Sequence, residues 1–524
     1  MSGNKLKTDT RLTPADIILL YPKTGMDLGG HTVAPPHALL AVAAPVHRAG
    51  YSIRIIDMRC DSQWRQTLQQ SIGSDTICVG ISTMTGNQIF FALLMAREAR
   101  RLTGGKVPLV WGGPHPTVMA EQTARHDLVD MVVAGEGEQT FLELVQALDH
   151  KRPLRGIAGL IYKDGGKVTV NPPRPLLDME TLLPVPWDLI NVENYISADN
   201  YFLKDSPRTL DIGQTSRGCP LRCGFCSSAS IRGRRWRAMS VAKSLDTILE
   251  PARRFNLTGV WIRDDEFYVH NQRAFTICER LVKEEDGLRW YTTGSRVDDF
   301  NRWSDEQIDL IKQSGCCITK FGAESGSDRV LDMINKGFHV EDTLKANLRC
   351  KKHGIVPAYS LVIGFPTQTF EEIHQTIDLG FRLRAENPRA QLENMAAYIP
   401  LPETPLWPAA LAAGLVPPDS LEGWVDWTID EYDLEGHRLA WYTQRERSWI
   451  GNISYLSILS NAVGNLGAGI QNKYMRALFL NVLKPLQPYF RFRMQHKHYR
   501  WVPELVPARY LRRSIFSRNE RNFR

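Results

Sequence analysis

The sequence predicts an α/β protein in three parts: an N-terminal doubly wound, Rossmann-like sheet, a full or partial barrel, and a mostly helical C-terminal region. Three observations predict this. Short apolar runs alternate with helix-like stretches from residue 15 to about residue 148, which is typical of a parallel sheet. A second α/β alternation of six repeats runs from about 210 to 400, as in barrels with their chemistry at the strand C-termini. Beyond Pro405 the pattern is mostly helical.

The N-terminal strands are short apolar runs bounded by turn residues. They are expected at 16–21, 52–57, 76–82, 107–111 and 131–134. A Gly-rich loop at 24–31 follows the first strand, and a helix is expected over 36–49 because Gly50 ends it. We therefore assign residues 1–150 to the first domain.

A hairpin with a glycine turn is expected next, from strands 157–162 and 167–170, followed by a Pro-rich linker. We assign 151–205 to hairpin and linker, 206–405 to the barrel, and 406–524 to the helical region. The barrel strands are expected to begin near Leu210 and then to recur at 259–263, 289–295, 317–323, 356–363 and 391–399.

Composition describes an ordinary globular chain of two or three domains, with 524 residues, 43% hydrophobic and 23% charged. Asp9 and Asp16 interrupt the layout of a signal peptide, and no apolar run reaches the ~18 residues of a spanning helix. We expect a cytoplasmic, soluble or peripheral protein with reduced cysteines. Five tryptophans of the last region are candidates either for a pocket lining or for packing: Trp407, Trp424, Trp427, Trp441 and Trp449.

The last forty residues carry most of the positive charge. Residues 485–524 hold ten Lys/Arg and two Asp/Glu, together with eight aromatic side chains. Such a tail can meet phosphates, anionic lipid or nucleic acid, or it can pack on the body with its arginines solvated. Both readings stay open. The first predicts a peripheral contact with the inner membrane face.

Three cysteines within eight residues are the strongest chemical signal. Cys219, Cys223 and Cys226 form C-x3-C-x2-C on a loop. Three thiolates can hold three irons of a 4Fe–4S cluster and leave the fourth open. A structural zinc site would need a fourth ligand, and no second C-x-x-C pair exists.

This motif resembles that of the radical S-adenosylmethionine (SAM) superfamily, as do the preceding 214–218 segment and Phe225. The resemblance covers about residues 210–400 and implies a partial (β/α)6 barrel. It also implies that SAM chelates the open iron and that an electron from the cluster yields a 5′-deoxyadenosyl radical. That electron needs an external donor such as flavodoxin or ferredoxin.

Further barrel positions correspond to the family's SAM site in their order. Asp264-Asp265-Glu266 replaces the usual Gly-Gly-Glu after the second strand, so the carboxylate that meets the SAM amino group stays open. The resemblance implies an acidic contact to the ribose at Glu324. The SAM-binding residues that it implies are Phe225, Asp264, Asp265, Glu266, Ser295, Arg296, Glu324, Lys336 and Gly364.

The N-terminal part resembles the cobalamin-binding domains attached to many radical SAM enzymes. The likeness rests on Pro35-Pro36 and on three strand ends where small residues let backbone approach a large ligand. The cobalamin-binding residues that it implies are Ser82, Thr83, Met84, Thr85, Gly112, Gly113, His115, Gly135 and Glu136.

Two motifs are missing from the first loop. The cobalt-binding Asp-x-His-x-x-Gly is absent, because residues 26–31 read Met-Asp-Leu-Gly-Gly-His, so we expect no histidine below cobalt. A G-x-G-x-x-G is also absent, which disfavours a nicotinamide site. The alternative is a degenerate domain that binds no corrinoid.

Both resemblances together predict a cobalamin-dependent radical SAM methyltransferase that acts on an unactivated carbon of a small-molecule or lipid-like intermediate. The alternative uses the same parts for oxidative cyclisation or rearrangement, as in the anaerobic cyclase of chlorophyll synthesis. RNA modification ranks last. The family's RNA methylthiotransferases carry three further N-terminal cysteines, whereas here only Cys60 and Cys78 precede the motif, so we expect no nucleic-acid partner.

Overall fold

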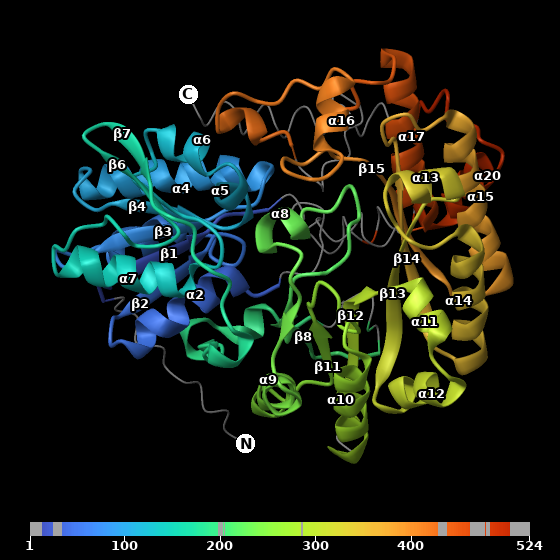
Figure 1. The fold of residues 1–524 in the computed structure, drawn as a ribbon, viewed down its shortest axis with the longest axis horizontal. Coiled ribbons are helices and arrows are strands. Elements are labelled where there is room, and N and C mark those ends of the chain that lie inside the picture. The colour runs from blue at the N-terminus through green and yellow to red at the C-terminus, as the bar shows by residue number, and fades with distance from the viewer. Residues whose placement is uncertain are drawn as a thin grey trace.

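The structure is a computed structural model that describes residues 13–24, 34–197, 203, 205–284, 287–427, 438–461, 477, 481 and 483–503. Figure 1 shows two α/β bodies side by side. The N-terminal sheet lies at the left, the barrel at the right, and the C-terminal helices lie above and beside the barrel.

The N-terminal sheet has the strand order β2-β1-β3-β4-β5-β6-β7. Its first five strands are parallel, as predicted: β1 (Ile17–Tyr21), β2 (Ile53–Asp57), β3 (Cys78–Ser82), β4 (Leu109–Gly112) and β5 (Met131–Val133). Successive side chains of β1 face opposite sides of the sheet. Ile17 packs under α2 (His37–Arg48) and α7 (Gly137–Asp149), whereas Ile18 packs under the helices of the other face. Those are α3 (Trp64–Ser71), α4 (Asn87–Thr103) and the short α5 (Pro114–Val118) and α6 (Ala120–Arg125).

The predicted hairpin belongs to this sheet and not to the linker. β6 (Leu160–Asp164) pairs antiparallel with β5, and β7 (Lys167–Val170) pairs with β6. The reason is that β5 would otherwise present an open edge with unpaired backbone groups. The turn is made by Gly165 and Gly166, both at positive φ, as the glycine pattern predicts.

The barrel is an open, parallel, six-stranded sheet in the order β15-β14-β13-β12-β11-β8. Its strands are β8 (Thr209–Gly213), β11 (Gly259–Ile262), β12 (Arg289–Ser295), β13 (Cys316–Glu324), β14 (Val356–Ile363) and β15 (Gln391–Ala397). Within the described residues, β8 and β15 form the two edges and do not pair with each other. The expected partial (β/α)6 barrel is therefore confirmed.

Helices follow the barrel strands along the chain and cover the outer face in Figure 1. They are α9 (Val241–Arg254), α10 (Asn271–Glu284), α11 (Val297–Arg302), α12 (Asp305–Gln313), α13 (Asp328–Met333), α14 (Val340–His353) and α15 (Phe370–Glu386). Two residues at the start of the barrel, Leu210 and Ile212, share one core with these helices.

The C-terminal region is mostly helical, as predicted. Its helices are α16 (Trp407–Ala412), α17 (Gln444–Asn461) and α20 (Gln487–Gln495). Trp424 is fully buried and joins the core of the N-terminal sheet, so this tryptophan serves packing. Among the described residues, no helix is long and apolar enough to cross a membrane.

Candidate functional site

The cysteine loop runs over 218–227, between β9 (Ser216–Arg217) and α8 (Ser228–Arg232). Gly218 has a φ of +84°, and a Cβ there would collide with the carbonyl oxygen of Arg235. Its amide donates to Asp265 Oδ2 at 2.8 Å. Further along, the Gly224 amide donates to Ile334 O at 2.7 Å, and Gly224 O accepts from Leu406 N at 2.9 Å. The loop is thus held in place by other parts of the barrel at two points.

The three cysteines fit a cluster as a donor set on one loop. All three are half-buried thiols without a disulfide. Burial, together with the smaller effects of the neighbouring Glu266, Cys223 and Cys226, raises the pKa of Cys219 to about 12. Within the described residues, no three metal-ligating side chains converge closely enough to hold an ion as they stand. Cationic iron is what would convert such thiols to thiolates and draw them together.

The three consecutive carboxylates after β11 have different environments. Asp264 is buried and accepts hydrogen bonds from both the amide and the hydroxyl of Thr215 and Ser216, at 2.6–3.0 Å. All of its acceptor capacity is used to fix the chain before the cysteine loop. Asp265 holds the Gly218 amide and lies 3.6 Å from Arg232.

Glu266 is the carboxylate left for a cationic ligand. Within the described residues its side chain accepts one long hydrogen bond, from the Tyr268 amide at 3.4 Å. Burial and, to a smaller extent, Asp299 raise its pKa to about 8 against the opposing effects of the Tyr268 amide, Arg296 and Lys336. A buried carboxylate with so few partners is stabilised by a cation. The structure therefore favours Glu266 over Asp264 for the ammonium group of SAM.

A buried ion pair lies across the barrel mouth from Glu266. Lys336 Nζ is 2.9 Å from Glu324 Oε1, and both side chains are at most 10% exposed. Gly322 makes room for this pair, because a Cβ there would lie 2.8 Å from Lys336 Nζ. Burial lowers the pKa of Lys336, but Glu324 and Cys223 raise it by more, so the ammonium persists.

The remaining residues implied for SAM lie around this pair. Arg296 donates to Lys336 O at 2.8 Å, and Lys336 Nζ is 5.6 Å from the centre of the Phe225 ring. The buried hydroxyl of Ser295 has no hydrogen-bond partner among the described residues. A Cβ on Gly364 would contact Leu439 and Ile450, and the ring of the next residue, Phe365, lies 5.8 Å from that of Phe225.

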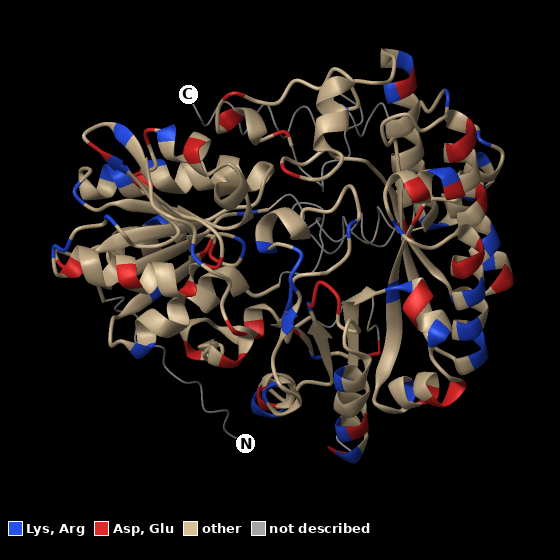
Figure 2. Cartoon of the chain, viewed as in Figure 1, with Lys and Arg blue, Asp and Glu red and all other residues tan. Residues whose placement is uncertain are grey.

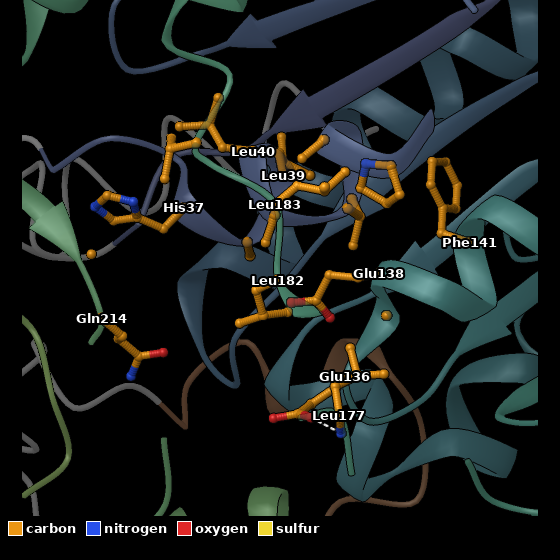
Figure 3. A pocket seen from close by; sticks show the side chains of 18 of the residues that line it. His37, Leu39, Leu40, Glu136, Glu138, Phe141, Leu177, Leu182, Leu183 and Gln214 are labelled. Atoms are coloured by element: carbon orange, nitrogen blue, oxygen red, sulfur yellow. Dashed lines mark hydrogen bonds between the residues drawn. The ribbon is translucent and has the colours of Figure 1, made fainter. Parts of the chain in front are cut away.

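A cavity of about 880 Å³ lies between the N-terminal sheet and the barrel. Its volume is at the upper end of small-molecule sites. Figure 3 shows Leu39, Leu40, Leu182, Leu183 and Phe141 along one side and Gln214 of the barrel across from them. Five residues implied for cobalamin line it: Ser82, Gly112, Gly113, Gly135 and Glu136.

The other four implied cobalamin residues, Thr83, Met84, Thr85 and His115, are absent from the cavity lining. His115 Nδ1 is 3.0 Å from Thr85 Oγ1, and its ring packs edge-on against Trp424. Burial lowers the pKa of His115 to about 4, so the ring is neutral. The loop with His31 lies outside the described residues.

Gly113 has a structural reason to be glycine. Its φ is +97°, and a Cβ would lie 2.7 Å from Thr83 O. The exit of β3 therefore requires the glycine whether or not a ligand is bound.

Charged contacts across the cleft are the functional candidates that sequence reasoning missed. Arg217, which directly precedes the cysteine loop, pairs with Glu138 at 2.7 Å and with Glu136 at 3.5 Å. Glu136 also binds Arg237 at 2.7 Å. These glutamates lie at the start of α7, so the ion pairs join the sheet domain to the residue before the cysteine loop. Figure 3 shows both glutamates at the cavity.

A second missed contact links the first helix to the first barrel strand. His37 Nε2 lies 2.9 Å from Asp211 Oδ1, and Arg263 Nε lies 2.6 Å from Asp211 Oδ2. The position of His37 directly after Pro36 was the available signal, because that helix start faces the cavity. Figure 2 shows such acidic and basic segments in the centre of the molecule as well as on the outer helices.

The comparisons with known proteins agree with both halves of the site. Residues 214–380 match the Radical SAM superfamily, and residues 31–145 match the B12 binding domain. An uncharacterized methyltransferase of Pyrococcus horikoshii is 35% identical over 388 residues, which cover 74% of this chain and 80% of that protein. The anaerobic magnesium-protoporphyrin IX monomethyl ester cyclase of Rubrivivax gelatinosus is 29% identical over 304 residues. These cover 57% of this chain and about half, 52%, of the cyclase.

The fold is shared with a solved enzyme. The cobalamin-dependent S-adenosylmethionine radical enzyme OxsB, solved with aqua-cobalamin and S-adenosylmethionine bound, has a TM-score of 0.67 and 18% identity. The match covers 96% of this chain and 76% of that one.

Proposed function

Because this chain belongs to the radical SAM enzymes that carry a B12 binding domain, we propose that it methylates an unactivated carbon of a small-molecule or lipid-like intermediate. It is a cobalamin-dependent radical SAM enzyme whose cofactors are a 4Fe–4S cluster, SAM and cobalamin. When bound, these supply a radical that removes a hydrogen atom from carbon and a methyl group that replaces it.

One observation carries the proposal: the cavity at the strand ends of the sheet extends to residues that flank the cysteine loop. Its lining includes the strand ends of the sheet at Ser82 and Gly112, and also Gln214, Arg217 and Arg232 on either side of the cysteine loop. A corrinoid held on the sheet would therefore lie beside the cysteine loop. This neighbourhood is what delivery of a methyl group to a carbon radical requires.

On the barrel side, the chain's own residues would orient SAM. Glu266 would accept the ammonium group, because it is a buried carboxylate with few partners. Glu324 and Lys336 would hold the ribose end through their buried pair, and Phe225 beside Lys336 would give an apolar surface. Cys219, Cys223 and Cys226 would hold the cluster.

On the sheet side, the chain would exclude water from the cavity and fix the distance between the sheet domain and the cysteine loop. Leu39, Leu40 and Leu183 present apolar surface to the cavity. The Arg217 contacts with Glu136 and Glu138 hold the sheet domain against the start of the cysteine loop. A reactive carbon radical is thereby kept away from solvent.

A second candidate function, oxidative ring closure, is favoured by the 29% identity to the cyclase of Rubrivivax gelatinosus. It would use the same cleft without methyl transfer. Isotope labelling distinguishes the two, because ring closure removes two hydrogens and leaves no label from SAM in the product.

The test is an anaerobic assay of reconstituted protein with trideuteromethyl-SAM, a flavodoxin or ferredoxin reducing system, and a metabolite and lipid extract from cells that lack the gene. We expect a product that carries one trideuteromethyl group in place of a hydrogen. The Cys219→Ala, Cys223→Ala, Cys226→Ala variant should make none. Cys317→Ala, which changes a half-buried thiol at the start of β13, should keep the activity. An unlabelled product lacking two hydrogens would instead establish the cyclase reaction.

A further inference from the structure

The C-terminal helix α20 has apolar residues on both of its sides. Phe490 and Met494 are buried at 2% exposure against α15 of the barrel and α17 of the C-terminal region. Tyr489 and Phe492 are about half exposed, and Leu486, just before the helix, is 42% exposed. These three are spaced three residues apart, so they share one helix face. The packing of α20 on the barrel therefore leaves a second apolar face in solvent.

Trp501 extends this face just beyond the helix, with 77% of its surface exposed. Eight large hydrophobic side chains are exposed among the described residues, and four of them lie between 486 and 501. We call Leu486, Tyr489, Phe492 and Trp501, with the exposed Lys484, Arg491 and Arg500, the C-terminal surface. Such clustering of exposed apolar side chains marks an interaction site.

The charge of the C-terminal surface is of one sign. Residues 484–503 contain five Lys/Arg and no Asp/Glu. Arg493 is buried and donates to His498 O at 2.7 Å, and Lys497 pairs with Asp378 at 3.0 Å. None of the three cations of the C-terminal surface pairs with a carboxylate in the described part of the chain. Arg491 Nε donates to Ser460 O at 3.0 Å, and the Arg500 guanidinium lies 4.9 Å from the centre of the Trp449 ring.

We propose that the C-terminal surface binds the headgroup region of an anionic lipid bilayer. Trp and Tyr favour that depth of a membrane, and Lys and Arg near it are attracted to anionic lipid. A second copy of this chain would bring like charges together, and an RNA would leave Leu486 and Phe492 in water. Anionic lipid meets both the apolar and the cationic groups.

The position of this surface leaves the cavity accessible. In Figure 1, α20 lies beside α15 and α17 at the right, whereas the N-terminal sheet lies at the left. A bilayer at α20 would contact the outer side of the barrel and leave the interface of the two α/β bodies uncovered. The inference does not depend on the reaction that the enzyme catalyses.

The test is flotation of the full-length protein with vesicles of phosphatidylcholine and phosphatidylglycerol at low salt. Wild type should float, and flotation should fall with added salt or with pure phosphatidylcholine. The Tyr489→Ser, Phe492→Ser, Trp501→Ser variant should bind at least about tenfold more weakly, because it loses the apolar contact. The double variant Arg491→Gln, Arg500→Gln should weaken binding about thirtyfold. Each cation near anionic lipid contributes about 1 kcal/mol, which is about fivefold in affinity, and the two factors multiply.

A matched control removes exposed apolar groups elsewhere: Val170→Ser, Leu348→Ser, Val416→Ser. It should float like wild type. If the aromatic variant floats as well as wild type, the binding belongs to another part of the chain and the proposal is overturned. The proposal is also overturned if the control variant no longer floats, or if wild type binds RNA but does not float. A third contrary result is a wild-type dimer that is lost in the aromatic variant but kept in the control.

Discussion

The barrel mouth and the strand C-termini of the N-terminal sheet are built differently, and of the two only the strand C-termini line the large cavity. At the barrel mouth, buried charges such as Lys336 and Glu324 lie within hydrogen-bond distance of each other. At the strand C-termini of the sheet, the cavity is lined mainly by glycines and apolar side chains, and Glu136 and Glu138 are paired with arginines of the barrel. The barrel side is suited to a small charged ligand and the sheet side to a large, mostly apolar one. Substitutions on the two sides should therefore differ in the property that they affect and in the size of the effect.

The largest expected effect is on the barrel side. Replacing Cys219, Cys223 and Cys226 together by Ala should reduce the iron content of anaerobically reconstituted protein from about four per chain to none. The broad absorption near roughly 400 nm should disappear with it, because thiolate-to-iron charge transfer produces it. Cobalamin uptake should persist, since its cavity is lined mostly by other residues. An intact cluster in this variant would refute the assignment of the loop.

Breaking the buried pair should be the next largest effect. Lys336→Met leaves the Glu324 carboxylate buried without its partner, which costs about 3–5 kcal/mol of unfolding free energy. Arg382→Met, which breaks an exposed pair with Glu386 on α15, should cost at most about 1 kcal/mol. Urea denaturation of both variants measures the difference. Equal losses would show that the barrel-mouth pair is not specially stabilising.

Glu266 should make stability depend on pH. Its pKa of about 8 in the folded chain lies above that of an unfolded glutamate, so the folded state binds more protons between the two values. Stability from this group is present at low pH and is lost as pH rises through about 8, by at most about 1.4 kcal/mol per pH unit. The free energy of unfolding of wild type, minus that of Glu266→Gln, should fall from pH 5 to 8. A flat difference would mean that Glu266 is already paired.

A smaller effect is expected from substituting two adjacent glycines at the C-terminus of β4. Gly113→Ala should destabilise the protein by about 1–3 kcal/mol, because φ is +97° and Cβ would collide with Thr83 O. Gly112→Ala should cost less, since its Cβ would lie 3.5 Å from Val133 O, an ordinary contact. Thermal unfolding of the pair tests this order. The reverse order would mean that the β3 exit can move.

Sequence reasoning predicted the architecture almost completely, because buried parallel strands are short apolar runs between turn residues. It grouped the hairpin with the linker outside the first domain, since pairing of β6 with β5 is a tertiary contact with no local signal. At the barrel mouth it named Lys336 and Glu324, because the order of strand-end motifs along the chain is preserved. At the strand C-termini of the N-terminal sheet it named Thr85 and His115, which bind each other beside Trp424.

The side-chain contacts that the sequence did not predict share a physical cause. A loop at a strand end is near the site by topology, but the direction of each side chain depends on packing from distant segments. Trp424 and Arg217 are such distant partners, and their contacts with His115 and Glu138 join segments far apart in the chain. Position along the chain therefore predicts that a residue lies at a strand end, but it does not predict which contacts its side chain makes.

The central claim is that cobalamin and the cluster share one cleft, and paramagnetic resonance tests it most directly. Protein loaded with both cofactors and reduced anaerobically should show a cobalt(II) signal broadened by spin coupling to the reduced cluster. The same signal should be unbroadened in the Cys219→Ala, Cys223→Ala, Cys226→Ala variant, which keeps the cavity. Identical cobalt(II) signals in the two proteins, with both cofactors present in wild type, would contradict the account.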